Sequence, residues 1–340
     1  MIDMIHIGDY KTGTSWLQKF YFSSHPDLHY LDSGRDQRII RLMHRLVDER
    51  DLDFDAISLR SEFAKVIKDA NIEHKKVVIS REALSGLYPR GEHAKRNAER
   101  LFSVFGSTKV LIVIREPFSM LASIYSQYVK MGGTLSMKAF VFDPVVSPGL
   151  IERLKYAKMI DAYVKIFGGE NVLTVLFDEF EADNQHFGQR VSGFIGCSSE
   201  WSPPLFHQPA NPSLTRAGLE VQRIINRFLR NEMNPGMPLI PFDAVLAQIV
   251  GPRVKERLIN SVRTRLVYSQ PGKDDPYVLR YAINSAATLY ISKLCERIRW
   301  GRKIAVPDII VRQLSEEFSP SNRILRDKYH LPVEKFGWSL

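Results

Sequence analysis

The residues best suited to chemistry stand near the start of the chain, between an apolar run and an aromatic one. Residues 8–15 read Gly-Asp-Tyr-Lys-Thr-Gly-Thr-Ser. The two glycines permit backbone angles that a side chain forbids, and the hydroxyls can cap a helix that begins near Thr14. The first N–H groups of such a helix lack partners within it and favour an anion. With Lys11 supplying most of the positive charge, this turn predicts a site for an anionic group.

The spacing of this turn differs from that of the loops that bind nucleoside triphosphates. The pattern of those loops is G-x-x-x-x-G-K-[ST]. Gly8 and Gly13 keep the spacing, and Ser15 takes the hydroxyl position. However, Thr14 stands where the lysine belongs, and Lys11 comes two residues before the second glycine. The loop is therefore expected to cradle an anion whose countercharge arrives from another direction.

A second group of residues follows a strand that the sequence predicts at residues 109–114. Arg115 comes directly after this apolar run, Pro117 suits the first turn of a helix, and Ser123 lies about two turns along that helix. Open α/β sheets bind ligands beyond the carboxyl ends of their strands. Arg115 and Ser123 could therefore reach one phosphate from the same side, although a lone arginine after a strand is more often a structural ion pair.

The two groups together resemble the sulfotransferases that use 3′-phosphoadenosine 5′-phosphosulfate (PAPS). The 5′-phosphosulfate loop of that family is similar to the run Lys11, Thr12, Gly13, Thr14, Ser15 and Trp16. The 3′-phosphate motif of the family is similar to the strand that ends in Arg115, with Ser123 eight residues on. The resemblance implies that these residues bind PAPS. Asp9 and Tyr10 depart from the family pattern, which has a small residue or a proline before the lysine.

The resemblance also implies a general base that takes the proton of the acceptor hydroxyl. In the cytosolic branch of the family, this base is a histidine just after the strand that precedes the 3′-phosphate strand. Here that strand is predicted at residues 76–80, and the residue in the matching place is Glu82. A partly buried glutamate has a raised pKa and can hold a proton at neutral pH. Alternatively, Glu82 is a carboxylate favoured by a helix N-terminus, and His44 and Asp32 are the fallback bases.

The implied reaction is an in-line transfer of a sulfuryl group from PAPS to a hydroxyl or amine of a glycan, a glycolipid or a secondary metabolite. Lys11 would stabilise charge on the leaving phosphate, and Glu82 would accept the proton of the acceptor. No metal is expected, because a sulfuryl group carries less negative charge than the phosphoryl group for which kinases use Mg²⁺.

Two alternatives stay open beside this reaction. The first is a small-molecule kinase that uses a nucleoside triphosphate, which the absent Gly-Lys pair disfavours. The second is a nucleotide-binding protein without catalysis, which the presence of Lys11 and Glu82 disfavours.

Alternating apolar runs and helical patterns predict an α/β fold, with a central parallel sheet between two helical layers as in P-loop proteins. Strands are expected at residues 1–7, 76–80, 109–114 and 171–176. Helices are expected at residues 14–24, 37–49, 56–70, 93–105, 117–130 and 150–167, and a long loop at 132–149. The PAPS-binding core is expected over residues 1–200. A mostly helical extension over residues 201–340 is expected to pack on it as one integrated domain.

Part of the extension resembles the C-terminal helix of many bacterial members of the family. The similar residues are Ser321, Asn322 and Arg323, with Tyr329 further along. These residues imply a helix near the end of the chain, but they do not identify which C-terminal groups close over the cofactor.

Composition and charge limit the choice of partners. The 340 residues carry a net charge of +9, and the excess lies after residue 215, where 21 lysines and arginines face 12 acidic residues. This part of the chain suits an anionic cofactor or an acidic acceptor, and equally a set of solvated helix faces. No motif for nucleic acid is recognised, and no apolar run is long enough to span a bilayer. Because no signal-peptide pattern stands at the start, a cytoplasmic location is expected. The sequence does not indicate the oligomeric state.

Overall fold

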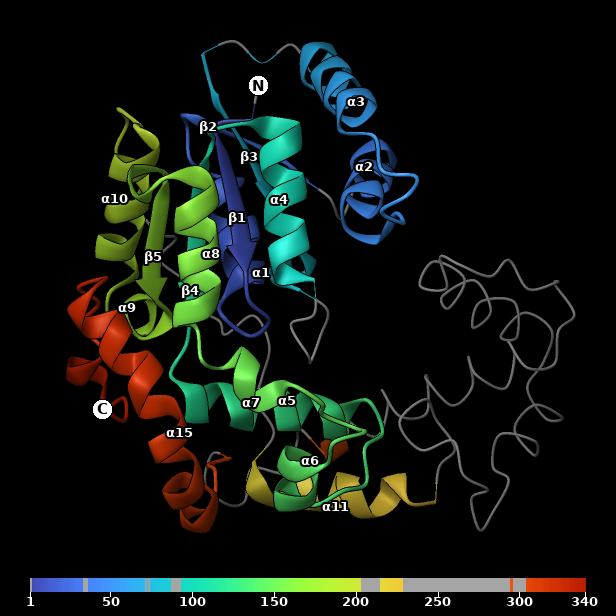
Figure 1. Ribbon diagram of the computed structural model, residues 1–340, viewed down its shortest axis with the longest axis vertical. Coiled ribbons are helices and arrows are strands. Elements are labelled where there is room, and N and C mark those ends of the chain that lie inside the picture. The colour runs from blue at the N-terminus through green and yellow to red at the C-terminus, as the bar shows by residue number, and fades with distance from the viewer. Residues whose placement is uncertain are drawn as a thin grey trace, which may run out of the picture. The chain divides into compact units, whose positions relative to one another are not determined.

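The structure is a computed structural model that describes residues 2–32, 36–70, 72, 74–86, 93–202, 215–228, 294–295 and 304–340 (Figure 1). The described strands are β1 (Met4–Gly8), β2 (Leu28–Leu31), β3 (Lys76–Ser80), β4 (Lys109–Ile114) and β5 (Val172–Leu176). The described helices are α1 (Thr14–Trp16), η1 (Leu17–Phe22), α2 (Gln37–Asp48), α3 (Ala56–Asp69), η2 (Glu82–Ser85), α4 (Ala94–Phe105), α5 (Pro117–Lys130), α6 (Met137–Phe142), α7 (Leu150–Arg153), α8 (Ala157–Phe167), η3 (Gly169–Asn171), α9 (Phe177–Ala182), α10 (Asn184–Ile195), α11 (Arg216–Asn226), α15 (Asp308–Asp327) and η4 (Glu334–Phe336).

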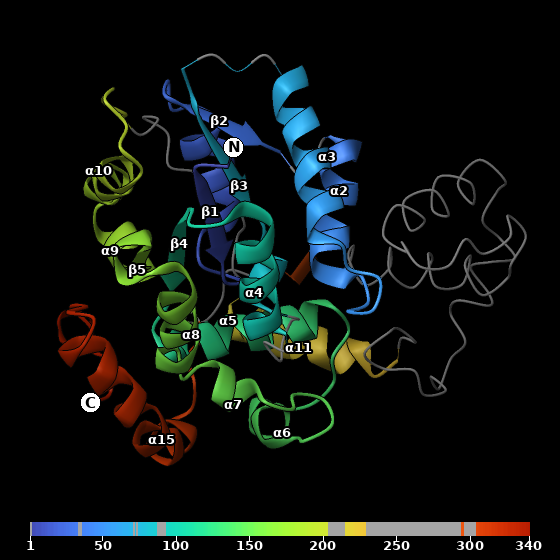
Figure 2. The same cartoon turned by 45° about the horizontal axis from the view of Figure 1, so that its top comes forward.

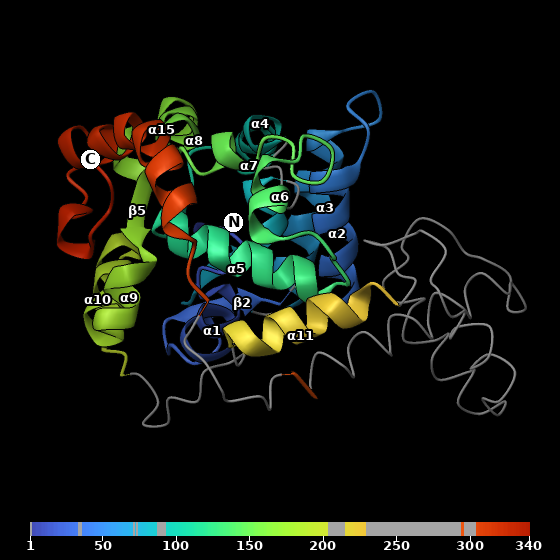
Figure 3. The same ribbon diagram turned by 90° about the horizontal axis from the view of Figure 1, so that it is seen from below.

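The chain divides into two compact units. The first comprises Met1–Met120, Asp143–Ala210 and Pro307–Leu340, and it contains the whole described sheet. The second comprises Leu121–Phe142 and Asn211–Val306. Within the second unit, α11 runs alongside α5 (Figure 3). The division into a core over residues 1–200 and an extension over residues 201–340 stays a prediction.

The described strands form one parallel sheet in the order β2-β3-β1-β4-β5. Met4 of β1 pairs with Val78 of β3 on one side and with Lys109 of β4 on the other. Strands buried on both faces of a parallel sheet read as continuous apolar runs, as β4 does after Lys109, whereas β1 is equally buried but includes His6. The predicted α/β fold with a central parallel sheet flanked by helices is therefore confirmed.

Helices cover both faces of the sheet. Alternate strand residues, among them Met4, Leu111 and Val175, pack with side chains of η1 and α10 on one face. On the opposite face α4 and α8 lie side by side across the strands (Figure 1). A fully buried aliphatic side chain contributes roughly 1.5–3 kcal/mol, so these two layers stabilise the strand ends that carry the candidate site.

Helices α2 and α3 pack together on the side of the sheet that ends in β2 (Figure 2). At the other end of the chain, α15 contacts α8 within the first unit, so residues far apart in sequence share one core. Much of the expected C-terminal extension lies outside the described residues, and the described part is largely helical in α11 and α15. Among the described helices, none has the length and apolarity that crossing a membrane requires.

Several expected boundaries were wrong. The sequence reading omitted β2, a short edge strand in which only Leu28 and Leu31 are buried. The first helix continues as a π-helix over η1, a rare form that is frequent at functional sites. Residues 132–149 contain the helix α6, rather than only a loop. The helix expected at residues 150–167 is broken between α7 and α8, because Leu154–Tyr156 leave the helical path.

Candidate functional site

Three predicted site residues follow three neighbouring strands. The chain lays down β2 and β3 on one side of β1 and then β4 and β5 on the other, so β1 lies at the switch point of the sheet. Open α/β sheets bind ligands beyond the carboxyl ends of the strands at this point. Lys11 follows β1, Glu82 follows β3 and Arg115 follows β4. Residues separated by about a hundred positions are thereby brought to one edge.

The loop after β1 has an unusual backbone. Lys11 has a φ of 66°, in the left-handed region that residues with a side chain rarely adopt, and Gly13 has a φ of 77°. A Cβ on Gly13 would lie 3.0 Å from the ring of Phe177, and a Cβ on Gly8 would lie 2.7 Å from the ring of His6. Strain of this kind is concentrated at ligand sites, because the surrounding structure must hold it in place. Both glycines therefore serve a tight loop rather than flexibility.

The hydroxyls of the loop have different roles. The hydroxyl of buried Thr12 donates a hydrogen bond to the carbonyl of Asp9 at 2.6 Å, and the hydroxyl of Thr14 donates to the same carbonyl at 3.4 Å. These two side chains close the loop on itself. Ser15 is exposed, and Trp16 is half-buried with its ring 4.7 Å from the ring of Phe180. Of the loop side chains, Tyr10, Lys11, Ser15 and Trp16 thus retain exposed surface.

Arg115 joins the two predicted motifs directly. Its Nη1 donates a hydrogen bond to the carbonyl of Lys11 at 3.1 Å. Its guanidinium carbon lies 4.7 Å from the centre of the Phe177 ring, within the range of a cation–π contact. Arg115 is half-buried, so the loop and the first residue of α9 hold its guanidinium in place. A cation fixed beside the loop can serve an anionic ligand without reorganising first.

Glu82 begins the short helix η2 and is half-buried. Burial raises the pKa of its carboxyl group from 4.5 to about 6, and the Asp9 carboxylate also raises it. The Lys11 ammonium and the Arg153 guanidinium act in the opposite direction. A carboxyl group with a pKa near neutrality can accept a proton at physiological pH and release it afterwards. Glu82 therefore has the electrostatic environment of a general base beside the loop that carries Lys11.

The remaining candidates lie elsewhere. Ser123 is on α5 but belongs to the second unit, so its partnership with Arg115 stays a prediction. The Nδ1 atom of His44 is 2.8 Å from the Asp48 carboxylate on the same helix, which gives His44 a structural partner. Asp32 follows the edge strand β2, which β3 separates from β1. The geometry therefore favours Glu82 over both fallback bases.

The sequence reading missed a buried ion pair in the loop. The Asp9 carboxylate accepts a hydrogen bond from Arg153 of α7, and their side chains are only 3% and 5% exposed. The same Asp9 oxygen accepts the N–H of Tyr10 at 2.8 Å. An aspartate in a loop that is expected to bind an anion is the sequence clue, because a buried charge of this kind requires a cation nearby.

A second missed group lies beneath the loop. His6 is fully buried, burial lowers its pKa to about 3, and its Nδ1 lies 2.8 Å from the hydroxyl of Ser80. The amide of Gln18 donates to the carbonyl of Ser80 at 3.3 Å and to its hydroxyl at 3.1 Å. These bonds connect β1, β3 and η1 under the strand ends. The group is a neutral support for the loop.

Three residues of the C-terminal motif, Ser321, Asn322 and Tyr329, make contacts that are structural. The hydroxyl of Ser321 accepts the N–H of Ala157 at 3.2 Å, which caps the start of α8. The amide of Asn322 donates to the carbonyl of Ser339 at 2.8 Å, and the hydroxyl of Tyr329 bonds to the Asp161 carboxylate. These contacts fasten α15 and the chain end to α8.

A cluster away from the loop contains residue types that can bind metal. Ligand atoms of His25, Asp27 and Cys197 all lie within 4.8 Å of one another. However, the Asp27 carboxylate accepts bonds from the N–H and hydroxyl groups of Ser198–Ser199, and both nitrogens of His25 have partners, one of them Ser192. His25 and Asp27 therefore already have partners within the protein, and none of the predicted site residues belongs to the cluster.

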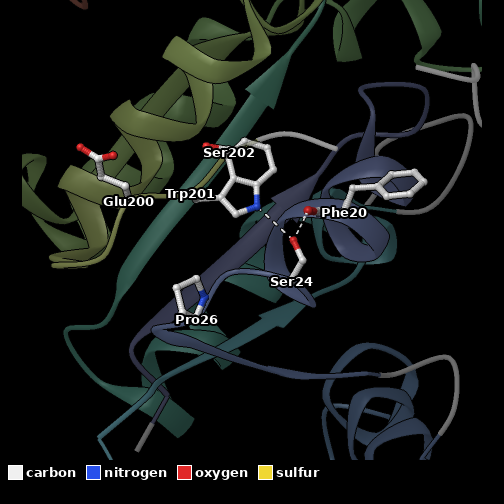
Figure 4. Close-up of a pocket in the computed structure, with 6 residues that line it drawn as sticks. All are labelled: Phe20, Ser24, Pro26, Glu200, Trp201 and Ser202. Carbon is white, nitrogen blue, oxygen red and sulfur yellow. Dashed lines mark hydrogen bonds between the residues drawn. The ribbon is translucent and has the colours of Figure 1, made fainter. Parts of the chain in front are cut away.

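A shallow cavity of about 320 Å³ lies between the end of η1 and residues 200–202 (Figure 4). The indole nitrogen of Trp201 donates to the hydroxyl of Ser24 at 3.0 Å, and that hydroxyl donates to the carbonyl of Phe20. None of the predicted site residues lines this cavity. Its polar lining is held by these internal bonds, and the strand ends stay the better candidate site.

Comparisons with known proteins gave matches among solved structures. No model of a known family matches the chain, and no curated protein matches it. Among solved structures, the chain is similar to the crystal structure of a sulfotransferase from Alicyclobacillus acidocaldarius. The identity is 22%, the alignment covers 62% of this chain and 87% of that chain, and the TM-score is 0.46. At these values the likeness carries no conclusion about chemistry, which has to come from the side chains.

Proposed function

We propose that this protein transfers a sulfuryl group from PAPS to a hydroxyl or amine of an acceptor. The observation that carries the proposal is the meeting of Lys11, Glu82 and Arg115 at the ends of adjacent strands, with Arg115 bonded to the Lys11 carbonyl at 3.1 Å. Two cations and a carboxyl group with a pKa near neutrality suit the transfer of a group from an anionic nucleotide to a hydroxyl.

The loop fits a ligand that carries phosphate. A Cβ on Gly8 would meet Thr14 and His6, and one on Gly13 would meet Phe177, so both glycines let the loop pack tightly on the residues beneath it. Backbone N–H groups in such a turn, followed by a helix start, favour an anion. Residues 11–16 would hold the 5′-phosphosulfate of PAPS, and Arg115 with Ser123 would hold the 3′-phosphate. PAPS would supply the activated sulfuryl group.

Two side chains then have separate chemical roles. Lys11 stabilises negative charge on the oxygen that leaves with the 5′-phosphate, an electrostatic effect that is often the largest in catalysis. Glu82, ionised at neutral pH because its pKa is about 6, accepts the acceptor's proton as the new bond forms. The proposal includes no metal, because these residues supply the charge and the base. It takes a glycan, a glycolipid or a secondary metabolite as the acceptor.

The test begins with nucleotide binding. The thermal midpoint of the full chain is compared with 3′-phosphoadenosine 5′-phosphate, with adenosine 5′-phosphate as a control that lacks the 3′-phosphate, and with ATP and Mg²⁺. A rise with the first nucleotide alone supports the proposal, because a ligand that binds only the folded state stabilises it. A rise with ATP and Mg²⁺ alone would support the kinase alternative instead.

Transfer is then measured directly with PAPS labelled in the sulfuryl group and a panel of hydroxyl-bearing acceptors, with and without a chelator. Label that moves to an acceptor in the presence of chelator supports a transferase without a metal. Binding of the nucleotide without transfer to any acceptor would support a non-catalytic binding protein.

A further inference from the structure

Asp9 is an unexpected residue in a loop that binds an anion. Its carboxylate is 3% exposed, so water cannot screen its repulsion of a phosphate or sulfate group. Among the described residues, Arg153 supplies the cation that neutralises it, and the Arg153 side chain is 5% exposed. Removing one partner of a buried ion pair leaves an uncompensated charge and strongly destabilises the folded state. The pair therefore permits an acidic residue where the ligand needs a basic surface.

The pair also joins three elements of the first unit. Asp9 belongs to the loop after β1, and Arg153 is the last residue of α7. The third element is η2, whose Ser85 hydroxyl lies 3.5 Å from the Asp9 carboxylate and 3.3 Å from the Arg153 Nη2. The same hydroxyl donates to the carbonyl of Glu82 at 2.8 Å. Because this hydroxyl has a single proton, which it gives to the Glu82 carbonyl, the connection runs through Arg153, whose Nη2 donates both to the Ser85 hydroxyl and to the Asp9 carboxylate. The turn that begins with Glu82 is thus linked through Arg153 to the loop that carries Lys11.

Tyr10 adds a second connection between the same elements. The guanidinium carbon of Arg153 lies 5.5 Å from the centre of the Tyr10 ring, in cation–π range. Burial raises the pKa of the Tyr10 hydroxyl, and the Glu82 carboxylate raises it further, which places Tyr10 in the field of that group. Asp9 holds the backbone of Tyr10 through its N–H at 2.8 Å. Arg153 therefore contacts both Tyr10 of the loop and Ser85 of the turn that begins with Glu82.

We infer that Asp9 and Arg153 form a positioning pair, which holds Glu82 against the loop so that the base and Lys11 face the same reacting group. This inference rests on the proposed function, because Glu82 and Lys11 have these roles only in that reaction. This inference gives a role to Asp9 and Tyr10, the two loop residues that depart from the family pattern. Their partner from α7 is Arg153.

The pair predicts opposite electrostatic effects on Glu82. Among the described residues, the charged and titratable groups that act on it are Lys11, Asp9 and Tyr10 from the loop and Arg153 from α7. The Arg153 guanidinium lowers the pKa of Glu82, so its loss raises that pKa. The Asp9 carboxylate raises the pKa, so its loss lowers it. A purely structural defect would give both variants the same direction.

The experiment compares the full chain with Arg153→Met, Arg153→Lys and Asp9→Asn, and with Arg100→Met as a matched control. Arg100 is also 5% exposed in its side chain and ion-paired, but its partner Asp51 lies in the turn between α2 and α3 and is 72% exposed. The measurements are the acidic limb of kcat/KM against pH, kcat, the KM for PAPS and the thermal midpoint. Arg153→Lys keeps the buried charge and serves if Arg153→Met fails to fold.

The expected acidic limb moves to higher pH in Arg153→Met and to lower pH in Asp9→Asn, because Glu82 must be ionised to act as base. In Arg153→Lys the limb stays in place, while kcat falls about 10–100-fold from lost orientation and the KM for PAPS changes little. Arg100→Met loses stability and keeps the wild-type limb.

Two failures are distinguishable. If the unmodified chain neither binds 3′-phosphoadenosine 5′-phosphate nor transfers the label, the proposed function is wrong, and the pair has no reaction to serve. If the unmodified chain transfers the label, the positioning role is overturned by limbs that move in the same direction or not at all, or by an Arg153→Lys variant with the wild-type kcat.

Discussion

Replacing Glu82 with glutamine tests the base and its energetic cost in one variant. Burial raises the pKa of this carboxyl group from 4.5 to about 6 in the folded chain. Below about pH 4.5 the group is protonated in both the folded and the unfolded chain, so it adds no difference in stability. Above about pH 6 the group is ionised in both the folded and the unfolded chain. Because the folded chain holds the charge less well, the ionised group then lowers the free energy of unfolding. The difference between the two pKa values corresponds to about 2 kcal/mol.

Glutamine has nearly the same shape and no charge to bury. The Glu82→Gln variant is therefore expected to be more stable than the unmodified chain near neutral pH, by up to about 2 kcal/mol. This gain shrinks as the pH falls through about 6 and disappears below about 4.5. Sulfuryl transfer is expected to fall about 10²–10⁴-fold, the usual contribution of a general base. Gained stability with lost activity is typical of a functional group held in an unfavourable environment.

The stability is measured by urea unfolding, followed by tryptophan fluorescence, at a neutral and at a mildly acidic pH. Transfer is measured with labelled PAPS at a saturating acceptor concentration. Glu181→Gln is the matched control, because Glu181 is exposed on α9 and should change stability by less than about 0.5 kcal/mol. The reasoning is refuted if Glu82→Gln is less stable than the unmodified chain at neutral pH, or if it transfers the label at the unmodified rate.

Three more outcomes follow from the loop. Lys11→Ala should lower kcat for sulfuryl transfer about 10²–10³-fold by removing charge stabilisation, whereas Lys19→Ala, an exposed lysine on η1, should transfer the label at the unmodified rate. Gly13→Ala should lower the free energy of unfolding by about 1–2 kcal/mol, because φ is 77° there, and should weaken nucleotide binding in titration calorimetry; Gly193→Ala on α10, where a Cβ meets nothing within 4 Å, should not. Arg115→Met should reduce the preference for 3′-phosphoadenosine 5′-phosphate over adenosine 5′-phosphate in the same titration, and an unchanged preference would remove Arg115 from the 3′-phosphate site.

The fold could be predicted to the extent that burial leaves a trace in the local sequence. Strands β3 and β4 have the bounds that their apolar runs predict, because a strand buried on both faces leaves no polar positions in its interior. Edge strand β2 has partly exposed His29 and Tyr30 between two buried leucines, and four residues of mixed character do not reveal a strand. The break between α7 and α8 leaves the apolar spacing of residues 150–167 intact, so no local pattern indicates it.

The candidate site was likewise predictable only in part. That Lys11, Arg115 and Glu82 lie at one edge of the sheet was predictable because each follows a strand within three residues, and parallel strands all end at one edge. Their roles in binding and catalysis stay a prediction. Their contacts were not predictable from sequence. The bond from Arg115 to the Lys11 carbonyl spans 104 positions, and the pair of Asp9 with Arg153 spans 144. Asp9 places a carboxylate in a loop that is expected to bind an anion, which indicates that a cation must lie nearby. The sequence does not identify which of its many arginines is that cation.

The attachment of α15 to α8 has a practical consequence for anyone preparing a shortened protein. The ring centres of Phe318 and Phe118 lie 5.4 Å apart, and the Ser321 hydroxyl caps α8, the helix that covers β4 and β5. A recombinant fragment ending at residue 200 would expose this apolar surface and leave the first turn of α8 uncapped. Such a fragment should aggregate during purification, whereas a protein that keeps residues 307–340 retains these contacts.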